Sequence, residues 1–382
     1  MSANSKIKIF LMGGNLIACK ILRHLFRMRN VSVTLVVASY EDNGAETNQN
    51  IWNASLVRTA LSKGLKVIQP FSLNSPEFLQ EVFKLERPDL IITADYNHFL
   101  NKELLALPKI GAINVHFSKL PRHRGYLPYV WSVLEDNETG VTLHWINDKI
   151  NGGDIIAQQT TPVGDLDTAY SLYLRLTKMA IKLFAKYFSQ IISGKAPRIP
   201  QDEKNASYHP MGYPYQGLID WRLPAEKIRR FVQALTFPGM VSPITYLSYM
   251  KIPIEILAPV AVIPKNSSDH PEPGMLTDVW TMFDEPVTPV INEMNGNAVK
   301  EFGATIQTGN GQILFNYFRI QGSTYRMKAH KLNNLFDVPI GAQLSGFKEL
   351  KSQKNMNLII SDYFPVHQNN NFSQQYDLPS TN

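Results

Sequence analysis

Residues 111–125, GAINVHFSKLPRHRG, decide how the rest of the sequence is interpreted. Apolar residues alternate there with Asn114 and His116, so in a β-strand both polar side chains point to the same side. The upstream run at residues 90–94, LIITA, is apolar and rich in β-branched residues, which is typical of a buried parallel strand. A strand that carries an amide and an imidazole on one face and ends in a proline- and glycine-containing loop is how an open α/β sheet presents a site.

A carboxylate follows at Asp154, on the glycine-softened turn NGGD of residues 151–154. Asparagine, histidine and aspartate together are the groups that acyl transfer needs: an oxyanion donor, a proton carrier and a group that orients the imidazole. Each piece alone is weak evidence, because an Asn-x-His pair on a half-buried strand is more often a satisfied polar pair. A Gly-Gly-Asp turn alone is more often an ordinary turn.

The first half of the sequence reads as an alternation of strands and helices. Strands are predicted at residues 6–11, 31–37, 65–68, 141–146 and 155–159, and helices from residue 52 to 61, at 76–83, at 128–134 and after the capping residue Thr168. Gly13 and Gly14 follow the first strand without completing a G-x-G-x-x-G fingerprint, so no dinucleotide is inferred. This pattern predicts an α/β fold with a mostly parallel, Rossmann-like sheet.

Composition bounds the class of protein. The chain has 382 residues, of which 44% are hydrophobic and 18% charged, enough for a large core and two domains. The single cysteine, Cys19, excludes an internal disulfide and a cysteine-based zinc site, and no metal is expected. The net charge of +6 permits a polyanionic partner, but no dense basic run argues for nucleic acid outright. With no apolar stretch of membrane-spanning length and no signal-peptide pattern, we expect a cytoplasmic protein without a membrane partner.

The expected organisation is a catalytic domain at residues 1–197, a hinge or linker at 198–222, a second domain at 223–350, and a tail at 351–382 that is largely disordered at its end. Short β-type runs with glycine and proline punctuation between residues 244 and 320 predict a small, open β-barrel. Residues 265–273 have the composition of a mobile insertion.

Four sequence pieces in a fixed order carry a resemblance to a known family. They are Asn114-x-His116, the LPRHRG loop of residues 120–125, the TGVT of residues 139–142, and Gly153-Asp154. In this order they resemble the catalytic half of the 10-formyltetrahydrofolate-dependent formyltransferases. Relatives in that family are methionyl-tRNA formyltransferase, UDP-aminoarabinose formyltransferase, the hydrolase part of formyltetrahydrofolate dehydrogenase, and the sugar N-formyltransferases, which the chain resembles most.

The resemblance implies a Rossmann-like formyltransferase domain, an OB-like C-terminal domain and N10-formyltetrahydrofolate as formyl donor. It assigns Asn114 to the oxyanion and His116 to proton transfer, with Asp154 raising the pKa of the imidazole and fixing its orientation. It also implies donor contacts at three further places: the edge after residue 94, the position of Tyr126, and the turn before Asp154. The residues concerned are His98, Phe99, Leu100, Tyr126, Ile150, Asn151, Gly152 and Gly153, of which Tyr126 replaces the arginine found in relatives.

The acceptor amine is a separate question. The PYVW motif of residues 128–131 and the sequence of the hinge are similar to the corresponding sequences of sugar N-formyltransferases, which favours a nucleotide-linked amino sugar as acceptor. The basic charge and the OB-like domain keep initiator tRNA open as an alternative acceptor. Hydrolysis of the folate donor alone and a non-catalytic binding protein are further alternatives, although the intact Asn114, His116 and Asp154 argue against the latter. A homodimer through an exposed sheet or barrel edge is also possible.

Overall fold

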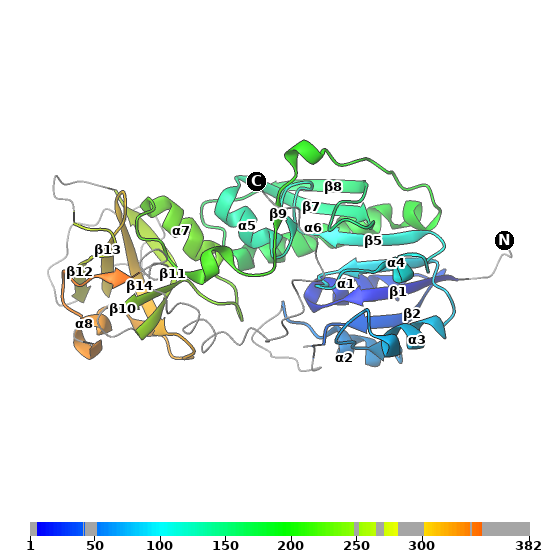
Figure 1. The fold of residues 1–382 in the computed structure, drawn as a ribbon, viewed down its shortest axis with the longest axis horizontal. Helices are drawn as coiled ribbons and strands as arrows, with labels where there is room; N and C mark the ends of the chain where they lie inside the picture. Colours follow the sequence, from blue (N-terminus) through cyan, green and yellow to red (C-terminus); the bar gives the residue numbers. More distant parts are fainter. Residues whose placement is uncertain are drawn as a thin grey trace. The chain divides into compact units, whose positions relative to one another are not determined.

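The computed structural model describes residues 6–40, 42, 52–247, 252–264, 271–281, 302–336 and 338–345 (Figure 1). The chain divides into two compact units. The first comprises Met1–Gly217, Arg229–Pro243 and Leu257–Val260, and the second comprises Leu218–Ile228, Ile244–Ile256 and Ala261–Asn382. The expected tail and most of the expected insertion, residues 265–270, lie outside the described residues.

The first unit is built on a seven-stranded sheet in the order β3-β2-β1-β4-β5-β7-β8. The pairs from β3 to β5 are parallel, whereas β7 pairs antiparallel with both β5 and β8. The predicted mostly parallel α/β sheet is therefore confirmed. The strands are β1 (Ile7–Gly13), β2 (Val31–Ala38), β3 (Val67–Ile68), β4 (Leu90–Ala94), β5 (Gly111–His116), β7 (Glu138–Trp145) and β8 (Ile155–Pro162).

Local capping chemistry sets the helix boundaries. The predicted start near residue 52 is too early, because the Ser55 hydroxyl accepts a hydrogen bond from the Arg58 N–H and caps the helix there. Thr168 caps the longest helix as predicted, in a reciprocal capping box with Ser171. The helices of this unit are α1 (Asn15–Leu25), α2 (Leu56–Leu61), α3 (Pro76–Phe83), α4 (Lys102–Leu105), α5 (Pro128–Glu135) and α6 (Ala169–Ile192).

Both faces of the sheet are covered by helices. Phe10 and Met12 of β1 pack with Phe78 and Val82 of α3 in one buried cluster, which also includes Leu100. Alternation along β1 turns the intervening residues toward the opposite face, where α1 packs against the sheet and α1 and α5 pack against α6. This two-sided burial fixes the sheet rigidly and leaves the carboxyl ends of β4 and β5 at one edge.

The second unit is a β-rich body, as expected. Its sheet runs β12-β13-β14-β11-β10-β16, with β15 paired to β14. The described pairings, such as β10 with β11 and β13 with β14, are antiparallel. The strands are β10 (Ile244–Leu247), β11 (Ile252–Ile263), β12 (Leu276–Thr281), β13 (Phe302–Gln307), β14 (Gln312–Ile320), β15 (Met327–Lys328) and β16 (Leu344–Ser345); the remaining helices are α7 (Ala225–Ala234), which runs through the division between the units, and α8 (Lys331–Phe336).

The polar stretch after α6, expected to be a linker, returns to the first unit. Ile199 forms a bridge with Ile155, and β9 (Tyr208–His209) pairs parallel with β6 (Arg124–Gly125). Between them lies the 3₁₀ turn η1 (Glu203–Asn205), and η2 (Pro214–Gly217) follows. Gly125 is required at this pairing because it has φ +96° and a Cβ there would lie 2.2 Å from the His209 carbonyl oxygen.

Candidate active site

Strand β5 brings the predicted amide and imidazole to the edge of the sheet. Asn114 pairs in register with Thr93 of β4 and with His144 of β7, and His116 pairs with Thr142. Asn114 is partly exposed, whereas His116 is 6% exposed. The alternation in the sequence thus correctly places both side chains on one face of a central strand.

Hydrogen bonds on both sides fix the orientation of the Asn114 side chain. His144 Nδ1 lies 2.7 Å from the Trp145 carbonyl oxygen, and because a carbonyl can only accept, Nδ1 carries the proton. Nε2 of the neutral ring therefore accepts, and the group facing it at 3.2 Å must be the Asn114 Nδ2 amide. The Thr93 hydroxyl donates to Asn114 Oδ1 at 2.7 Å. Among the described residues nothing occupies the second Nδ2–H, which remains available to an oxyanion.

The tautomer of His116 follows from the same reasoning. Its Nε2 lies 2.9 Å from the His123 carbonyl oxygen, so Nε2 carries the proton and Nδ1 holds the lone pair. The pKa of His116 is lowered to about 3, chiefly by burial; the electrostatic effects of His144, His123 and Arg124 act in the same direction, and the hydrogen bond to the His123 carbonyl opposes them. The net shift of this pKa is downward because burial dominates, and the raising effect expected of Asp154 stays a prediction. The imidazole is neutral at pH 7 and can accept a proton at Nδ1.

Asp154 lies two strands away from Asn114 in the register of the sheet. Its backbone carbonyl accepts from the Trp145 N–H at 2.9 Å, and the next residue, Ile155, pairs with His144. Its side chain is partly exposed and, within the part of the chain that the structure describes, has no hydrogen bond or ion pair. No described contact joins it to His116, so the predicted coupling of these two groups stays a prediction.

The close packing of the turn against β7 explains why the residue before Asp154 is a glycine. A Cβ on Gly153 would lie 2.0 Å from the Trp145 carbonyl oxygen, so only glycine allows this turn to approach β7 so closely. The turn is held from outside by Gln201, whose Nε2 donates to the carbonyl oxygens of Asn151 at 2.8 Å and Gly153 at 2.7 Å. The Asn151 Oδ1 in turn accepts from the Gly125 N–H at 2.9 Å. The turn that carries Asp154 is therefore tied to the loop that follows β5.

The residues expected to contact the donor occupy three segments of the first unit. His98, Phe99 and Leu100 follow β4; Phe99 is 40% exposed, whereas Leu100 is 3% exposed and belongs to the core. Tyr126 donates its backbone N–H to the His209 carbonyl at 3.0 Å, next to the loop after β5. The turn formed by Ile150, Asn151, Gly152 and Gly153 precedes Asp154. Donor contact at these positions stays a prediction.

Several residues that support the site were not predicted from the sequence. His144 carried a detectable signal, since it is a polar residue in a predicted strand and faces Asn114 in register. Gln201 and Glu203 carried none, because they hold the site from a polar segment far along the chain. Both accept hydrogen bonds from the Arg124 guanidinium, Gln201 at 2.8 Å and Glu203 at 2.9 Å.

The sequence is similar to those of known proteins over the region that forms this site. A family profile described as formyl transferase matches residues 5–187. The methionyl-tRNA formyltransferase of Citrifermentans bemidjiense is 34% identical over 238 residues, which is 62% of this chain and 74% of that protein. The chain belongs to the formyltransferase family, a family of enzymes. The corresponding protein of Methylacidiphilum infernorum is 36% identical over 199 residues, 52% of this formyltransferase and 62% of that relative.

Solved structures share the fold of this formyltransferase over most of its length. The sugar 3N-formyltransferase WlaRD, solved in the presence of dTDP and 5-N-formyl-THF, has a TM-score of 0.58 and 19% identity and covers 84% of this chain and 100% of its own. The N-formyltransferase of Helicobacter canadensis, in complex with folinic acid and dTDP-3-aminofucose, has a TM-score of 0.57 and 21% identity over 81% of this chain and 98% of its own. Among the described residues, no helix is both long enough and apolar enough to cross a membrane.

Proposed function

We propose that this formyltransferase moves the formyl group of N10-formyltetrahydrofolate to a primary amine, and that the amine belongs to a nucleotide-linked amino sugar. The observation that carries the proposal is the fixed amide of Asn114, oriented by Thr93 and His144 with one N–H left over. An immobile donor of this kind stabilises charge without reorganising when the reaction occurs.

In the proposed reaction the acceptor nitrogen forms a bond to the formyl carbon, and the bond from that carbon to N10 breaks. Asn114 donates to the oxygen that carries the negative charge in the tetrahedral intermediate. His116 accepts the proton that the amine loses, at Nδ1, and returns it to the departing nitrogen, which balances the reaction. Asp154 is the group proposed to stabilise the charged imidazole once substrates exclude water from the site.

Two considerations support an amino sugar as acceptor. Two structures of sugar N-formyltransferases, solved with dTDP or a dTDP-linked amino sugar, cover 84% and 81% of this chain. The PYVW of residues 128–131 forms the start of α5, beside the loop that holds His116.

Methionyl-tRNA is the second candidate acceptor. The sequence relatives at 34% and 36% identity are methionyl-tRNA formyltransferases, and the net charge of +6 suits a polyanion. The formyl transferase profile matches residues 5–187, which hold the proposed donor chemistry, and both classes of enzyme share that chemistry, so the amino sugar is preferred.

The acceptor is tested by supplying the full chain and the donor with one acceptor at a time. A panel of dTDP- and UDP-linked amino sugars and a charged initiator tRNA are each followed by mass spectrometry for the gain of one CO, and in parallel by release of tetrahydrofolate. A product with a nucleotide-linked amino sugar supports the proposal, and a product with the tRNA alone overturns it in favour of the second candidate. Tetrahydrofolate released at the same rate without any acceptor indicates hydrolysis and overturns both.

A further inference from the structure

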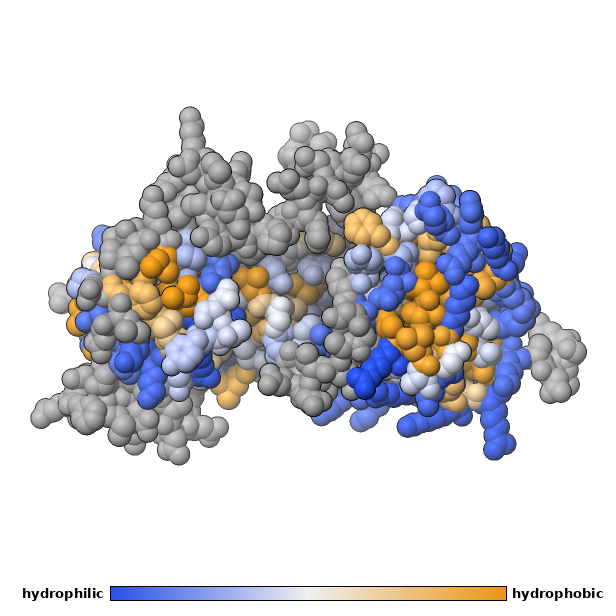
Figure 2. Space-filling view, turned by 90° about the horizontal axis from the view of Figure 1, so that it is seen from below, coloured by the Kyte–Doolittle hydropathy of each residue, from blue (hydrophilic) through white to orange (hydrophobic). Residues whose placement is uncertain are grey.

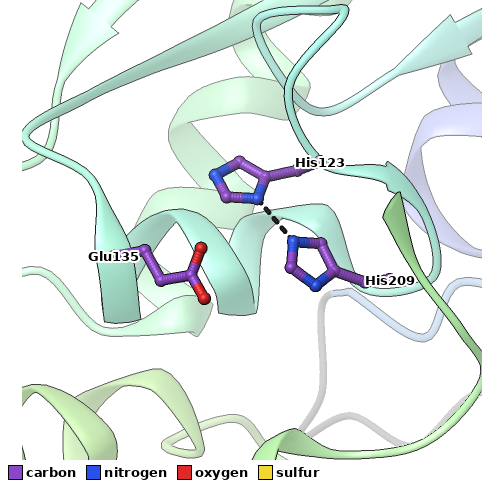
Figure 3. Close-up of side chains that lie close together, drawn as sticks. All are labelled: His123, Glu135 and His209. Carbon is purple, nitrogen blue, oxygen red and sulfur yellow. Dashed lines mark hydrogen bonds between the residues drawn. The ribbon is translucent and has the colours of Figure 1, made fainter. Parts of the chain in front are cut away.

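Two histidines from distant parts of the chain meet beside the candidate active site (Figure 3). His123 lies in the loop after β5, and His209 is the last residue of β9, 86 positions later. Their Nδ1 and Nε2 atoms are 2.8 Å apart, and their side chains are buried at 1% and 9% exposure. Figure 3 shows the carboxylate of Glu135, at the end of α5, turned toward the same point.

The proton positions on this pair follow from its neighbours. His123 Nε2 lies 2.5 Å from Asp136 Oδ2. The other oxygen of Asp136, Oδ1, forms a salt bridge with the Arg122 guanidinium, so Asp136 is a carboxylate that accepts the Nε2–H. In neutral His123 the lone pair is then on Nδ1 and points at His209. A single proton, carried by His209 Nε2, lies between two nitrogens that would both be acceptors without it.

Two such imidazole nitrogens with a carboxylate are a ligand set for a transition metal. The ligand atoms of His123, Glu135 and His209 all lie within 4.8 Å of one another. Two histidines and one glutamate with an open fourth position are among the sets that hold Zn²⁺. A carboxylate that accepts the other N–H of a ligating histidine, as Asp136 does for His123, is the usual outer partner at such sites.

We propose that His123 Nδ1, His209 Nε2 and the Glu135 carboxylate form a binding site for one divalent transition-metal ion of the Zn²⁺ class. On binding, the proton of His209 Nε2 shifts to Nδ1, so the ion replaces the proton between the two rings without net proton release. Zn–N bonds of about 2.0–2.1 Å in a tetrahedral arrangement separate two nitrogens by about 3.3 Å, so the rings part by only about half an ångström. Glu135 is exposed and its side chain can close the remaining distance.

The consequence of binding is mechanical. The ion would join the loop after β5, the end of α5 and β9, which at present are held by the short β6–β9 pairing and by hydrogen bonds such as His123 N–H to Ser207 Oγ at 2.8 Å. Because the His123 carbonyl accepts from His116, the ion would stiffen the loop that holds the proton carrier. The site is distinct from the proposed donor and acceptor chemistry, and its test does not depend on formyl transfer.

The test uses tag-free full-length protein that has been treated with a chelator and desalted. Co²⁺ is titrated while visible absorption is recorded, Zn²⁺ is then added as competitor, and the thermal unfolding midpoint is measured with and without Zn²⁺. We expect one ion per chain, a cobalt band that Zn²⁺ removes, and a midpoint raised by Zn²⁺. His209→Ala should abolish the band and the shift, and Asp136→Asn should weaken binding by about 10–100-fold.

Glu135→Gln is the variant that keeps the result interpretable, because it changes an exposed side chain and leaves the buried pair intact. We expect it to weaken Co²⁺ binding at least about tenfold with an unchanged metal-free midpoint. His24→Ala, which removes a histidine of α1 that is not part of the cluster, is the matched control and should bind as the wild type does. Absence of a cobalt band in the wild type, retained binding in His209→Ala, or unchanged binding in Glu135→Gln would each overturn the proposal.

Discussion

Gln201 holds the backbone carbonyl of Gly153 through a hydrogen bond of 2.7 Å, although the two residues are 48 positions apart. The segment that provides Gln201 comes after α6, and Gly153 immediately precedes Asp154. A residue outside the recognisable motif therefore sets the position of a carboxylate inside it. The catalytic groups thus depend on residues that hold them in position without taking part in the reaction.

Replacing Gln201 tests whether this support matters for the reaction. Gln201→Leu removes the donors to two carbonyls and the acceptor for Arg124. We expect unfolding free energy to fall by about 1–3 kcal/mol and kcat to fall by about tenfold or more, with a smaller effect on KM, because the turn that carries Asp154 loses its position. Gln190→Leu, on the exposed side of α6, is the matched control and should change neither quantity. An unaltered kcat in Gln201→Leu would show that the turn of residues 151–154 keeps its position without Gln201.

The coupling between Asn114 and His144 can be measured with a double-mutant cycle. Asn114→Ala should reduce kcat by about 10²–10³, the effect of losing one oxyanion donor. His144→Leu removes the acceptor that orients the amide and should cost a smaller part of the same effect. If His144 acts only through Asn114, the double variant should be no slower than Asn114→Ala alone. Simple addition of the two losses would mean that His144 has a separate role.

His116→Gln tests the proposed proton carrier. Glutamine can still donate to the His123 carbonyl, so the loop should keep its position while the proton-accepting nitrogen is lost. We expect kcat to fall by about 10²–10⁴ with donor binding changed only a few-fold, measured by fluorescence titration with 5-formyltetrahydrofolate. His116→Ala should be at least as slow. Turnover near the wild-type rate in either variant would refute the assigned role.

Asp154→Asn tests whether the carboxylate couples to His116 during turnover. Removal of its charge should lower kcat and shift the acid limb of the pH–rate profile, because a charged neighbour stabilises the protonated imidazole. The structure shows no contact between the two groups among the described residues, so any coupling must form in the complex with substrates. A lower rate with an unmoved acid limb would leave Asp154 with a positional role only.

The buried histidines predict how stability depends on pH. Burial lowers the pKa of His116 to about 3 and of His144 to about 4, below the value of about 6.5 in an unfolded chain. Between these pH values the unfolded state binds more protons than the folded state. The two histidines therefore leave the unfolding free energy undiminished above a pH of about 6.5 and lower it as the pH drops toward 4. Urea titrations at pH 7.5 and pH 5 should show this loss, and a smaller one for His144→Gln. Equal losses in both proteins would contradict the assignment.

The fold was largely predictable because its signals are local. Alternation along β4 and β5, proline at the start of α3 and the cap at Thr168 each depend on a few neighbouring residues, and all are found where predicted. Some boundaries are displaced: β3 begins at Val67, two residues later than predicted, and β7 begins at Glu138, three residues earlier. The late start of α2 has a local cause, since Ser55 offers a stronger helix start than the residues before it.

The residues that hold the site in position could not be predicted from such local signals. Gln201 and His209 lie in a polar stretch whose composition indicates a linker, and nothing in their own neighbourhood shows that they return to the catalytic loops. Likewise, the tautomers of His116 and His144 depend on which carbonyl each ring meets, which only the folded chain decides.

By itself, the sequence determined the strand that carries Asn114 and His116, the order of the catalytic pieces and the family to which they belong. It could do so because the alternation of apolar and polar residues, the helix caps and the turns each depend on residues within about one helical turn or one strand. Only the tertiary structure decided which nitrogen of each histidine is protonated, which carbonyl Gln201 holds and that His123 meets His209. The contacts of His116, Gln201 and His123 join residues between 7 and 86 positions apart, and their geometry follows from how the whole unit packs and not from any local pattern.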